Sequence, residues 1–598
     1  MTKLLGLILL DVYAVSAMTV SLASSVASPA PLGTLVRFTA TAAGADSGPL
    51  MYRFRTQFGS IRGKNHPFEP QFRTIVDYGP SSTLDWTTIS AEGPVEMEVS
   101  VENTATGETA TDSVPFEFSS LTQGDAPAAT PTGNPLVFIY SAPPCADGGQ
   151  MRVRFQAASG PAQFTPYQPC NGRATMNFYL AGMRAATTYT AQHTVLLHGT
   201  PTNGPVVELT TRVTTFAAPA ASPMSTPGPT TAGIILHGVV NSNVFATDLN
   251  GNLIWYSPSA MTFFTRAQTG GTFLSIFEDG TEGESHQYLR EFDLAGVTVA
   301  ETNAARVNEQ LKAIGRHPIT SFHHEAIRMP NGDYLVLAGS ERILTDVQGP
   351  GPVDVLGDTI LVLDRDLQVR WFWDAFDYLD AHRAAVLNET CTYPATVACS
   401  AFYGAKQAND WLHGNALQLA PDGNIIYSVR HQDWVVKIDY RNGAGTGKIL
   451  WRLGKDGDFQ IISNATHPWF SHQHDPHFLA KNSTMLLFDN GNTRIAQNPD
   501  ETTSRGMTLR INERTRTATV MMMANLKVSS AALGTAQLLD NGHYYFDAGF
   551  IPDPANPNGR ITQLLETDAT GNLVWGMNVA AQEYRSFRMK DLYTAPQL

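Results

Sequence analysis

The sequence predicts an all-β protein in which a six-bladed β-propeller follows two immunoglobulin-like or fibronectin-like β-sandwich domains. The chain of 598 residues contains 49 Gly and 36 Pro but only 16% charged residues, which is typical of a turn-rich β protein. Short strand patterns recur at a spacing of about ten residues in the first part of the chain. A longer strand pattern then repeats from about residue 230 to the C-terminus. At roughly 150 residues per domain, a single core is not expected for this length.

The first 23 residues have the pattern of a secretory signal peptide. Lys3 precedes an apolar run, and small residues follow near Ala17 and Ala23. We therefore expect residues 1–23 to direct the protein to the periplasm or out of the cell. No other segment approaches the roughly 20 apolar residues of a membrane helix, so we expect no membrane span.

Two small sandwich domains are predicted before the repeats. Residues 24–123 alternate short apolar strands with turns, which favours an immunoglobulin-like sandwich. A linker rich in Pro, Ala and Thr follows at 124–135, and a second set of strands indicates another sandwich over 133–218. Residues 217–233 are again rich in Pro, Ala and Ser and are predicted to be a second linker.

The repeat from residue 230 onward consists of a strand that ends in an acidic residue, a turn, and a strand that often ends in an aromatic residue. Units of this size, with four antiparallel strands each, bury their faces only against neighbouring units, as the blades of a propeller do. The sequence therefore predicts a six-bladed propeller over residues 230–598; a β-solenoid or stacked sandwiches are the alternatives. The six copies begin at FATDL (245), REFDL (290), LVLDR (361), VKIDY (436), LRINE (509) and LLETD (564).

The four cysteines fall into two close pairs, Cys145 with Cys170 and Cys391 with Cys399. This pairing predicts two disulfides in an oxidising compartment, and four buried thiols are the alternative. Neither pair has the C-x-x-C spacing of a zinc site. The net charge of −14 carries no run of Lys or Arg, which excludes a nucleic-acid surface as the expected function.

Histidines are concentrated in the middle of the repeat region. Ten of the sixteen lie between residues 317 and 477. The innermost strand of each propeller blade delivers side chains to the central channel, so histidines of different blades can converge there. We expect one histidine per blade at the channel: His323 or His324, then His413, then one member of the cluster at 472–477.

Three interpretations of these histidines compete. A metal site is the first, since imidazole suits zinc or copper and H-x-H on a strand places both rings on one face. Arg430, predicted to end the strand IIYSVR, would repel a cation, so we predict no metal. In the second, a neutral imidazole attacks phosphorus or sulfur while Asp475 fixes its tautomer. In the third, the histidines are hydrogen-bonded structural residues. This role is common for any single histidine but does not account well for four such motifs together.

Four motifs resemble those of the bacterial aryl sulfotransferases, which use phenolic sulfate esters rather than the nucleotide donor phosphoadenosine phosphosulfate. The motifs are HHEAIRMPNGDYLVL, DWLHGNAL, SVRHQDWVVKID followed by GKILWRLG, and SHQHDPHFL followed by LLFDNG. The resemblance covers about residues 230–598. It implies a six-bladed propeller with the site in its channel. It also implies ping-pong transfer of a sulfuryl group from a phenolic sulfate donor to a phenol acceptor through a sulfohistidine.

The resemblance also implies roles for individual residues. His474 of the Q-H-D motif would be the nucleophile, and Arg430 would hold the sulfate oxygens. His413 and Asn415 would contact the sulfuryl oxygens or the leaving group, and His324 would join them. The remaining substrate contacts would come from His323, the less favoured neighbour of His324, and from His431.

No cofactor is implied, which agrees with the lack of G-x-x-x-x-G-K-[ST] and G-x-G-x-x-G sequences. Two features depart from the family. Two sandwiches are predicted where family members have one smaller N-terminal domain, so a homodimer is possible but its arrangement is not implied. The pair Cys391 and Cys399 precedes DWLHGN, so no disulfide of the family is carried over to it. The alternative functions are a metal- or quinone-dependent propeller oxidoreductase and a non-catalytic adhesin or carbohydrate-binding propeller.

Overall fold

The computed structural model describes residues 17–596, apart from 45–46, 59–70, 91, 225–227, 229–230, 279–280, 282, 394–398, 400 and 480–482. Residues 1–16, most of the predicted signal peptide, lie outside this range. Strands dominate, and the only α-helices in the described ranges are α1 (Ala304–Ala313) and α2 (Asn492–Gln497). The prediction of an all-β protein is confirmed. No helix of the described residues is long and apolar enough to cross a bilayer.

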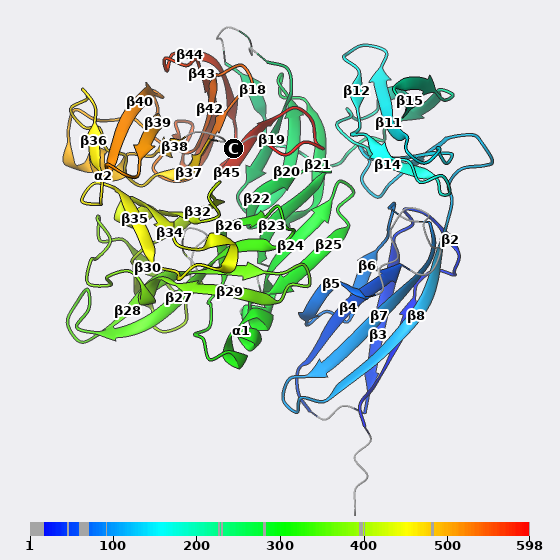
Figure 1. Cartoon of the computed structure of the whole chain (residues 1–598), viewed down its shortest axis with the longest axis horizontal. Coiled ribbons are helices and arrows are strands. Elements are labelled where there is room, and N and C mark those ends of the chain that lie inside the picture. Colours follow the sequence, from blue (N-terminus) through cyan, green and yellow to red (C-terminus); the bar gives the residue numbers. More distant parts are fainter. Residues whose placement is uncertain are drawn as a thin grey trace, which may run out of the picture.

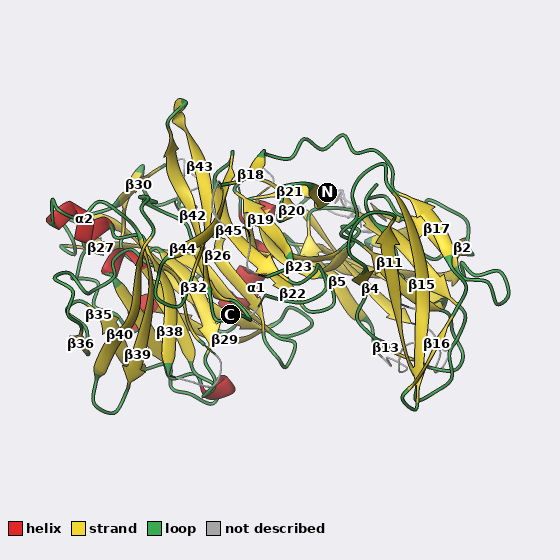
Figure 2. Ribbon diagram, turned by 90° about the horizontal axis from the view of Figure 1, so that it is seen from above, coloured by secondary structure: helices red, strands yellow, loops and turns green. Residues whose placement is uncertain are grey.

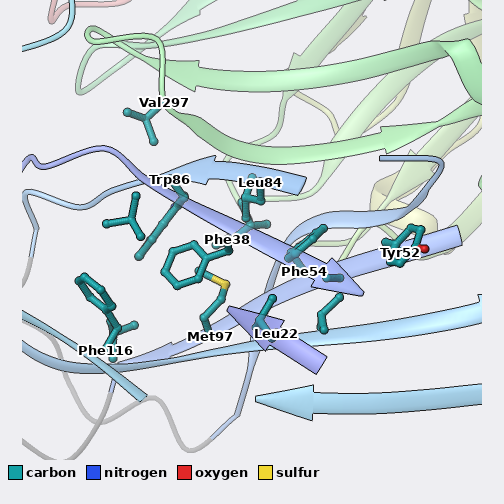
Figure 3. Close-up of a cluster of buried hydrophobic side chains, with 14 of the residues drawn as sticks. Leu22, Phe38, Tyr52, Phe54, Leu84, Trp86, Met97, Phe116 and Val297 are labelled. Carbon is teal, nitrogen blue, oxygen red and sulfur yellow. The ribbon is translucent and has the colours of Figure 1, made fainter. Parts of the chain in front are cut away.

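The N-terminal unit packs two sheets over one apolar core. Along β3, residues 36, 38 and 40 are buried while their neighbours are more exposed, because successive side chains of a strand point to opposite faces. Phe38 of β3 shares this core with Trp86, Met97 and Phe116, and the ring centroids of Phe38 and Phe116 are 5.9 Å apart (Figure 3). The strands are β1 (Thr19–Ser24), β3 (Val36–Ala43) and β6 (Thr83–Trp86) in one sheet, and β2 (Ala30–Pro31), β8 (Thr109–Ser119), β7 (Gly93–Asn103), β4 (Leu50–Phe58) and β5 (Arg73–Gly79) in the other.

This N-terminal unit is joined to the repeat region by a shared sheet. Strand β5 pairs in parallel with β25 (Thr298–Asn303) at Val76 and Glu301, which extends the sheet to nine strands. Val297, next to β25, is buried in the N-terminal core (Figure 3). Apolar burial and backbone pairing therefore both fix the first unit against the repeat region.

The second unit is stapled by the disulfide between Cys145 and Cys170, as predicted. Both half-cystines lie in its apolar core beside Tyr140 and Phe178. Its strands lie with those of the first unit on one side of the repeat region (Figure 2). They are β9 (Ala128–Pro131), β10 (Phe138–Ala142) and β14 (Met176–Leu180) in one sheet, and β11 (Gln150–Ala157), β12 (Gln163–Phe164), β13 (Gln168–Pro169), β15 (Thr188–Leu197), β16 (Thr200–Asn203) and β17 (Val207–Thr210) in the other.

In the repeat region, one strand from each of six sheets contributes to a closed ring. Each of these strands contacts the next, and the last contacts the first. Figure 1 shows several of them around a common centre. In ring order they are β22 (Phe263–Gln268), β26 (Phe322–Arg328), β32 (Gly414–Leu419), β37 (His474–Phe478), β41 (Thr535–Leu538) and β45 (Glu583–Met589).

The next strands of these sheets extend outward from the ring, each antiparallel to its neighbour. They are β19 (Ile234–Val239), β20 (Ser242–Asp248), β21 (Leu253–Met261), β23 (Thr272–Glu278), β24 (Gln287–Asp293), β27 (Tyr334–Thr345), β28 (Pro352–Leu363), β29 (Val369–Asp374), β33 (Ile425–Val429), β34 (Trp434–Ile438), β35 (Ile449–Gly454), β38 (Thr484–Asp489), β39 (Arg505–Asn512), β40 (Thr517–Asn525), β42 (Tyr544–Asp553), β43 (Asn556–Thr567) and β44 (Leu573–Val579).

The C-terminal strand closes the ring. Strand β45 pairs antiparallel with β19, with Met589 opposite Ile234, so the two ends of the repeat region share one sheet. The Pro-rich segment 217–233, predicted to be a linker, also contributes a strand to a sheet of the repeat region. Its residues Ala221–Pro223 form β18, which pairs with β44.

Candidate active site

Three histidines from three neighbouring ring strands lie together. His324 is on β26, His413 directly precedes β32, and His474 begins β37. The ring centroids of His324 and His413 are 4.9 Å apart. Burial, then the charge of Arg430 and, to a smaller extent, that of His413 lower the pKa of His474. The structure thus brings together one histidine from each of these three strands.

The backbone is irregular at each of these histidines. His324 and His413 have φ values of 55° and 50°, and Asp475, next to His474, has 49°. A positive φ is uncommon for residues other than Gly and is concentrated at functional sites. The same three strands each carry a shift in pairing register at this place. Such irregularities change the direction of side chains, so that these residues do not follow the regular alternation between the two faces of a strand.

His474 is held in one tautomer by Asn490. Asn490 Nδ2 donates to the carbonyl oxygens of Ser530 and Leu533 at 2.7 and 2.9 Å, which leaves Oδ1 as the acceptor. His474 Nδ1 lies 2.6 Å from that Oδ1 and must donate to it. The Nε2 atom therefore carries a lone pair. Burial, with help from the charge of Arg430, holds the pKa of His474 well below its ordinary value, so the ring is neutral at pH 7.

Asp475 does not fix that tautomer, and the expectation that it would is wrong. Its Oδ1 accepts a hydrogen bond from Arg266 Nη2 at 2.8 Å, and Arg266 also binds Glu325 at 2.8 Å. Glu325 Oε2 is in turn 2.7 Å from Arg585 Nη1. Burial raises the pKa of Asp475, but Arg266 and Arg585 outweigh burial and lower it. This buried network ties together β22, β26, β37 and β45 and thus stabilises the ring.

His413 is paired with a carboxylate. Its Nδ1 lies 2.6 Å from Oδ2 of Asp410, the last residue of β31 (Gln407–Asp410). Asp410 Oδ2 also lies 3.4 Å from Cys391 Sγ in β30 (Thr390–Thr392), and Cys391 forms the predicted disulfide with Cys399. A carboxylate at Nδ1 orients the imidazole and leaves Nε2 for proton transfer.

Arg430 lies in a 3₁₀ turn, Arg430–Gln432, because β33 ends at Val429. The prediction that Arg430 ends the strand is therefore wrong. Its Nη1 donates to His431 Nε2 at 2.5 Å, and His431 Nδ1 donates to the Asp410 carbonyl oxygen at 2.7 Å. Burial lowers the pKa of Arg430, yet a guanidinium stays charged. Among the described residues, its buried Nε has no hydrogen-bond partner and is free to meet an anionic oxygen.

His323 and Asn415 border the three histidines. His323 Nδ1 is 2.9 Å from Nδ1 of His324, and its Nε2 is 3.1 Å from Asp358 Oδ1. Asn415 Nδ2 donates to the Gln473 carbonyl oxygen at 2.8 Å. Its buried Oδ1 finds no partner in the part of the chain that the structure describes. Both residues are therefore beside the candidate site, and Asn415 presents an unused acceptor.

The other two histidines of the 472–477 cluster have different surroundings. His472 Nδ1 is 2.8 Å from Asp433 Oδ1, and its Nε2 is 2.5 Å from Glu389 Oε1. His477 Nδ1 donates to the Asp475 carbonyl oxygen at 2.8 Å. Of the three, only His474 combines an amide acceptor at Nδ1 with the electrostatic influence of Arg430 and His413.

Sequence reasoning missed four residues of this site. Asn490 lies in the quoted LLFDNG motif and Asp410 in DWLHGNAL, so both were within reach of a search for histidine partners. Tyr584 donates to the His324 carbonyl oxygen at 2.8 Å, and Arg585 Nη2 donates to that of Asn415 at 2.7 Å. No pattern in the sequence indicated the last two, because β45 reaches the site only through closure of the ring.

Two groups of three side chains have metal-like spacing around His431, one with Asp410 and His413 and one with Glu389 and His472. In both groups the two nitrogens of His431 are already engaged by Arg430 and by the Asp410 carbonyl oxygen. The charge of Arg430 also opposes a cation there. The occupied nitrogens of His431 and the charge of Arg430 disfavour a cation at these two groups, and the expectation of no metal stays a prediction.

The profile of the arylsulfotransferase family matches residues 208–588. The chain therefore belongs to the arylsulfotransferase family, and the resemblance in the motifs is confirmed. Membership implies a sulfotransferase that acts on small molecules. No curated protein matches the chain at a significant level.

Two solved structures resemble the chain distantly. An auxiliary nutrient binding protein from Bacteroides ovatus is 10% identical over 76% of this chain and 88% of its own, with a TM-score of 0.25. The FN1–FN3 domains of chicken CNTN1 are 11% identical over 57% of this chain and 98% of theirs, with a TM-score of 0.13. Scores this low carry no argument about fold or function.

Proposed function

We propose that this protein transfers a sulfuryl group from a phenolic sulfate ester to a phenol, in two steps through a sulfohistidine at His474 and without a nucleotide donor. The observation that carries the proposal is the contact of His474 Nδ1 with Asn490 Oδ1, which leaves Nε2 as a buried, uncharged nucleophile. Neutral imidazole is a good nucleophile when a neighbouring group fixes its tautomer.

In the first step, His474 Nε2 attacks the sulfur of the donor ester. The N–S bond forms as the bond between sulfur and the phenolic oxygen breaks, and the phenolate takes up one proton as it leaves. Arg430, through its free Nε–H, would hold a non-bridging sulfate oxygen and stabilise the negative charge of the transition state. We assign His431 to holding Arg430 in place and His323 to supporting His324.

In the second step, the oxygen of the acceptor phenol attacks the same sulfur. The N–S bond breaks, His474 recovers its lone pair, and the acceptor loses one proton. His413 is the best candidate to give and then regain this proton, because Asp410 at its Nδ1 would stabilise the imidazolium. Among the residues that the structure describes, no carboxylate pairs with His324. Burial, followed by the charge of His413, holds its pKa well below the ordinary value, which suits a neutral hydrogen-bonding role. Asn415 Oδ1 would accept a hydrogen bond from the acceptor hydroxyl.

The proposed fold is a six-bladed β-propeller over residues 230–598, supported by the closed ring of six strands. Residues 24–123 and 133–218, each with two sheets over an apolar core, would be the immunoglobulin-like or fibronectin-like sandwiches. The two disulfides are compatible with the periplasmic or secreted location that we propose.

Mass spectrometry of the intact protein tests the proposal. The protein is incubated with p-nitrophenyl sulfate alone and digested. We expect the mass gain of one sulfuryl group on the peptide that contains residues 469–478, and its loss on addition of phenol. The matched variants His474→Asn, His472→Asn and His477→Asn separate the three histidines. A sulfuryl group that persists in folded His474→Asn protein would refute the assignment of the nucleophile.

A further inference from the structure

A cavity of about 730 Å³ lies along the sheet formed by β32–β35. Such a volume is typical of a site for a small molecule. It extends from outer strand β35, which lies on the left in Figure 1, toward the segments that flank the candidate active site. None of the proposed catalytic residues lines it. Its walls are made by Tyr378, Leu379, Asp380, Arg383, Trp411, Leu412, Gln432, Trp434, Ile449, Leu450, Arg452, Asp458 and Arg516.

Two of the three arginines in this cavity lack a carboxylate within salt-bridge distance in the described ranges. Arg383 Nε donates to the neutral amide of Gln432 at 2.7 Å. Arg516 Nη2 donates to the Leu450 carbonyl oxygen at 3.1 Å, and its Nη1 is buried with no partner among the residues described. Partly buried guanidinium groups are usually paired, so these two favour a negatively charged ligand.

The acidic groups of the cavity leave a positive excess. Asp458 is bound to the third arginine, Arg452, at 2.9 Å, and its charge also acts on Arg516. Asp380 has a side chain that is 75% exposed and pairs with His382 at 3.1 Å. Three arginines therefore face two carboxylates, of which one is already engaged and the other is in solvent.

Aromatic rings supply flat apolar walls between these charges. The guanidinium carbon of Arg383 lies 4.1 Å from the ring centroid of Trp434, and that of Arg452 lies 5.4 Å from it. Trp411 and the partly exposed Tyr378 contribute further aromatic surface. Arg side chains stacked on an indole present both a planar surface and hydrogen-bond donors at its edge.

We propose that this cavity is a binding site for a small aromatic molecule that carries one anionic group, a sulfonate or a carboxylate. The ring system would pack against Tyr378 and the exposed side chain of Leu450, beside the Arg383 guanidinium that is stacked on Trp434. The anionic group would accept hydrogen bonds from Arg383 and Arg516. The proposal does not depend on sulfuryl transfer, because it concerns binding alone at residues outside the reacting set.

The position of the cavity connects it to the catalytic motifs. Leu412 in its wall directly precedes His413, and Gln432 directly follows His431. Gln432 Nε2 donates to the Trp411 carbonyl oxygen at 2.9 Å, which joins the two segments. The ligand would therefore lie behind the backbone that carries His413 and Arg430, without touching their side chains.

Isothermal titration calorimetry of the full chain with 2-naphthalenesulfonate tests the proposal. The carbon–sulfur bond of this probe offers no sulfuryl group for transfer. We expect the double variant Arg383→Gln/Arg516→Gln to lose one bound probe per chain, or to bind it roughly tenfold or more weakly. Any probe bound in the candidate active site would remain. Unchanged stoichiometry and affinity in the double variant would overturn the proposal.

Three ligands and two variants sharpen this test. 2-Naphthoate should bind at the same site, whereas neutral naphthalene-2-carboxamide and inorganic sulfate should bind much more weakly. Equal binding of the amide would remove the role of charge, and equal binding of sulfate would remove the role of the ring. Leu450→Ser should also weaken the probe without adding a charge beside the arginines. Arg370→Gln, an exposed arginine outside the cavity, should bind like the wild type.

Discussion

His474 Nδ1 and Asn490 Oδ1 lie 2.6 Å apart, and the amide of Asn490 is locked by two backbone carbonyl oxygens. The contact joins the first residue of β37 to the turn after β38. It decides which nitrogen of the imidazole carries the proton, and hence which nitrogen can attack sulfur. The chemistry of the proposed nucleophile thus depends on a neutral amide rather than on the carboxylate beside it in the sequence.

Asn490→Ala should remove this control of the tautomer. We expect kcat for p-nitrophenyl sulfate to fall by roughly 10²- to 10⁴-fold, as is typical when a catalytic imidazole loses its orienting partner. KM should change little, because Asn490 does not contact the substrate in the proposed mechanism. Steady-state kinetics with a thermal melt measures both effects. Asn498→Ala, a half-buried asparagine that directly follows α2, is the matched control and should keep full activity. Full activity in Asn490→Ala would contradict the assignment.

His413→Gln should separate proton transfer from binding. The loss in kcat should be roughly 10²- to 10⁴-fold with phenyl sulfate, whose phenolate needs a proton, and much smaller with p-nitrophenyl sulfate. Rates with a series of substituted phenyl sulfates give this dependence directly. His382→Gln, which breaks an exposed His–Asp pair, should leave every rate unchanged. An equal loss for all donors would assign the proton to another residue, with His324 the next to test.

Acidification should destabilise the protein partly through His474. Burial lowers the pKa of His474 in the folded state, while the unfolded chain takes up a proton near pH 6.5. The stability from the neutral ring is therefore present above pH 6.5 and is lost as the pH falls toward the folded value, at about 1.4 kcal/mol per pH unit. In urea unfolding between pH 7 and 5, the free energy of unfolding should fall less steeply for His474→Asn than for the wild type. Parallel curves would show that His474 titrates normally.

Glu325→Gln should destabilise the ring strongly. Glu325 accepts hydrogen bonds from Arg266 and lies 2.7 Å from Arg585, and all three side chains are buried. Removal of the shared carboxylate leaves two buried guanidinium groups under-paired, at a cost of about 3–5 kcal/mol in the free energy of unfolding. Chemical denaturation measures this loss. Asp85→Asn, which breaks the exposed pair of Arg37 and Asp85, should cost less than about 1 kcal/mol.

The sequence by itself determined the all-β class, the family, both disulfides and the motifs that carry His324, His413 and His474. These features are local, because strand periodicity, turn residues and short motifs act over a few residues along the chain. Only the tertiary structure decided that β45 closes the ring and brings Arg585 to Glu325, that Arg430 lies in a turn, and that Asp475 binds Arg266 while Asn490 holds His474. These contacts join residues far apart in the sequence, and ring closure and register shifts rather than periodicity fix where the side chains point.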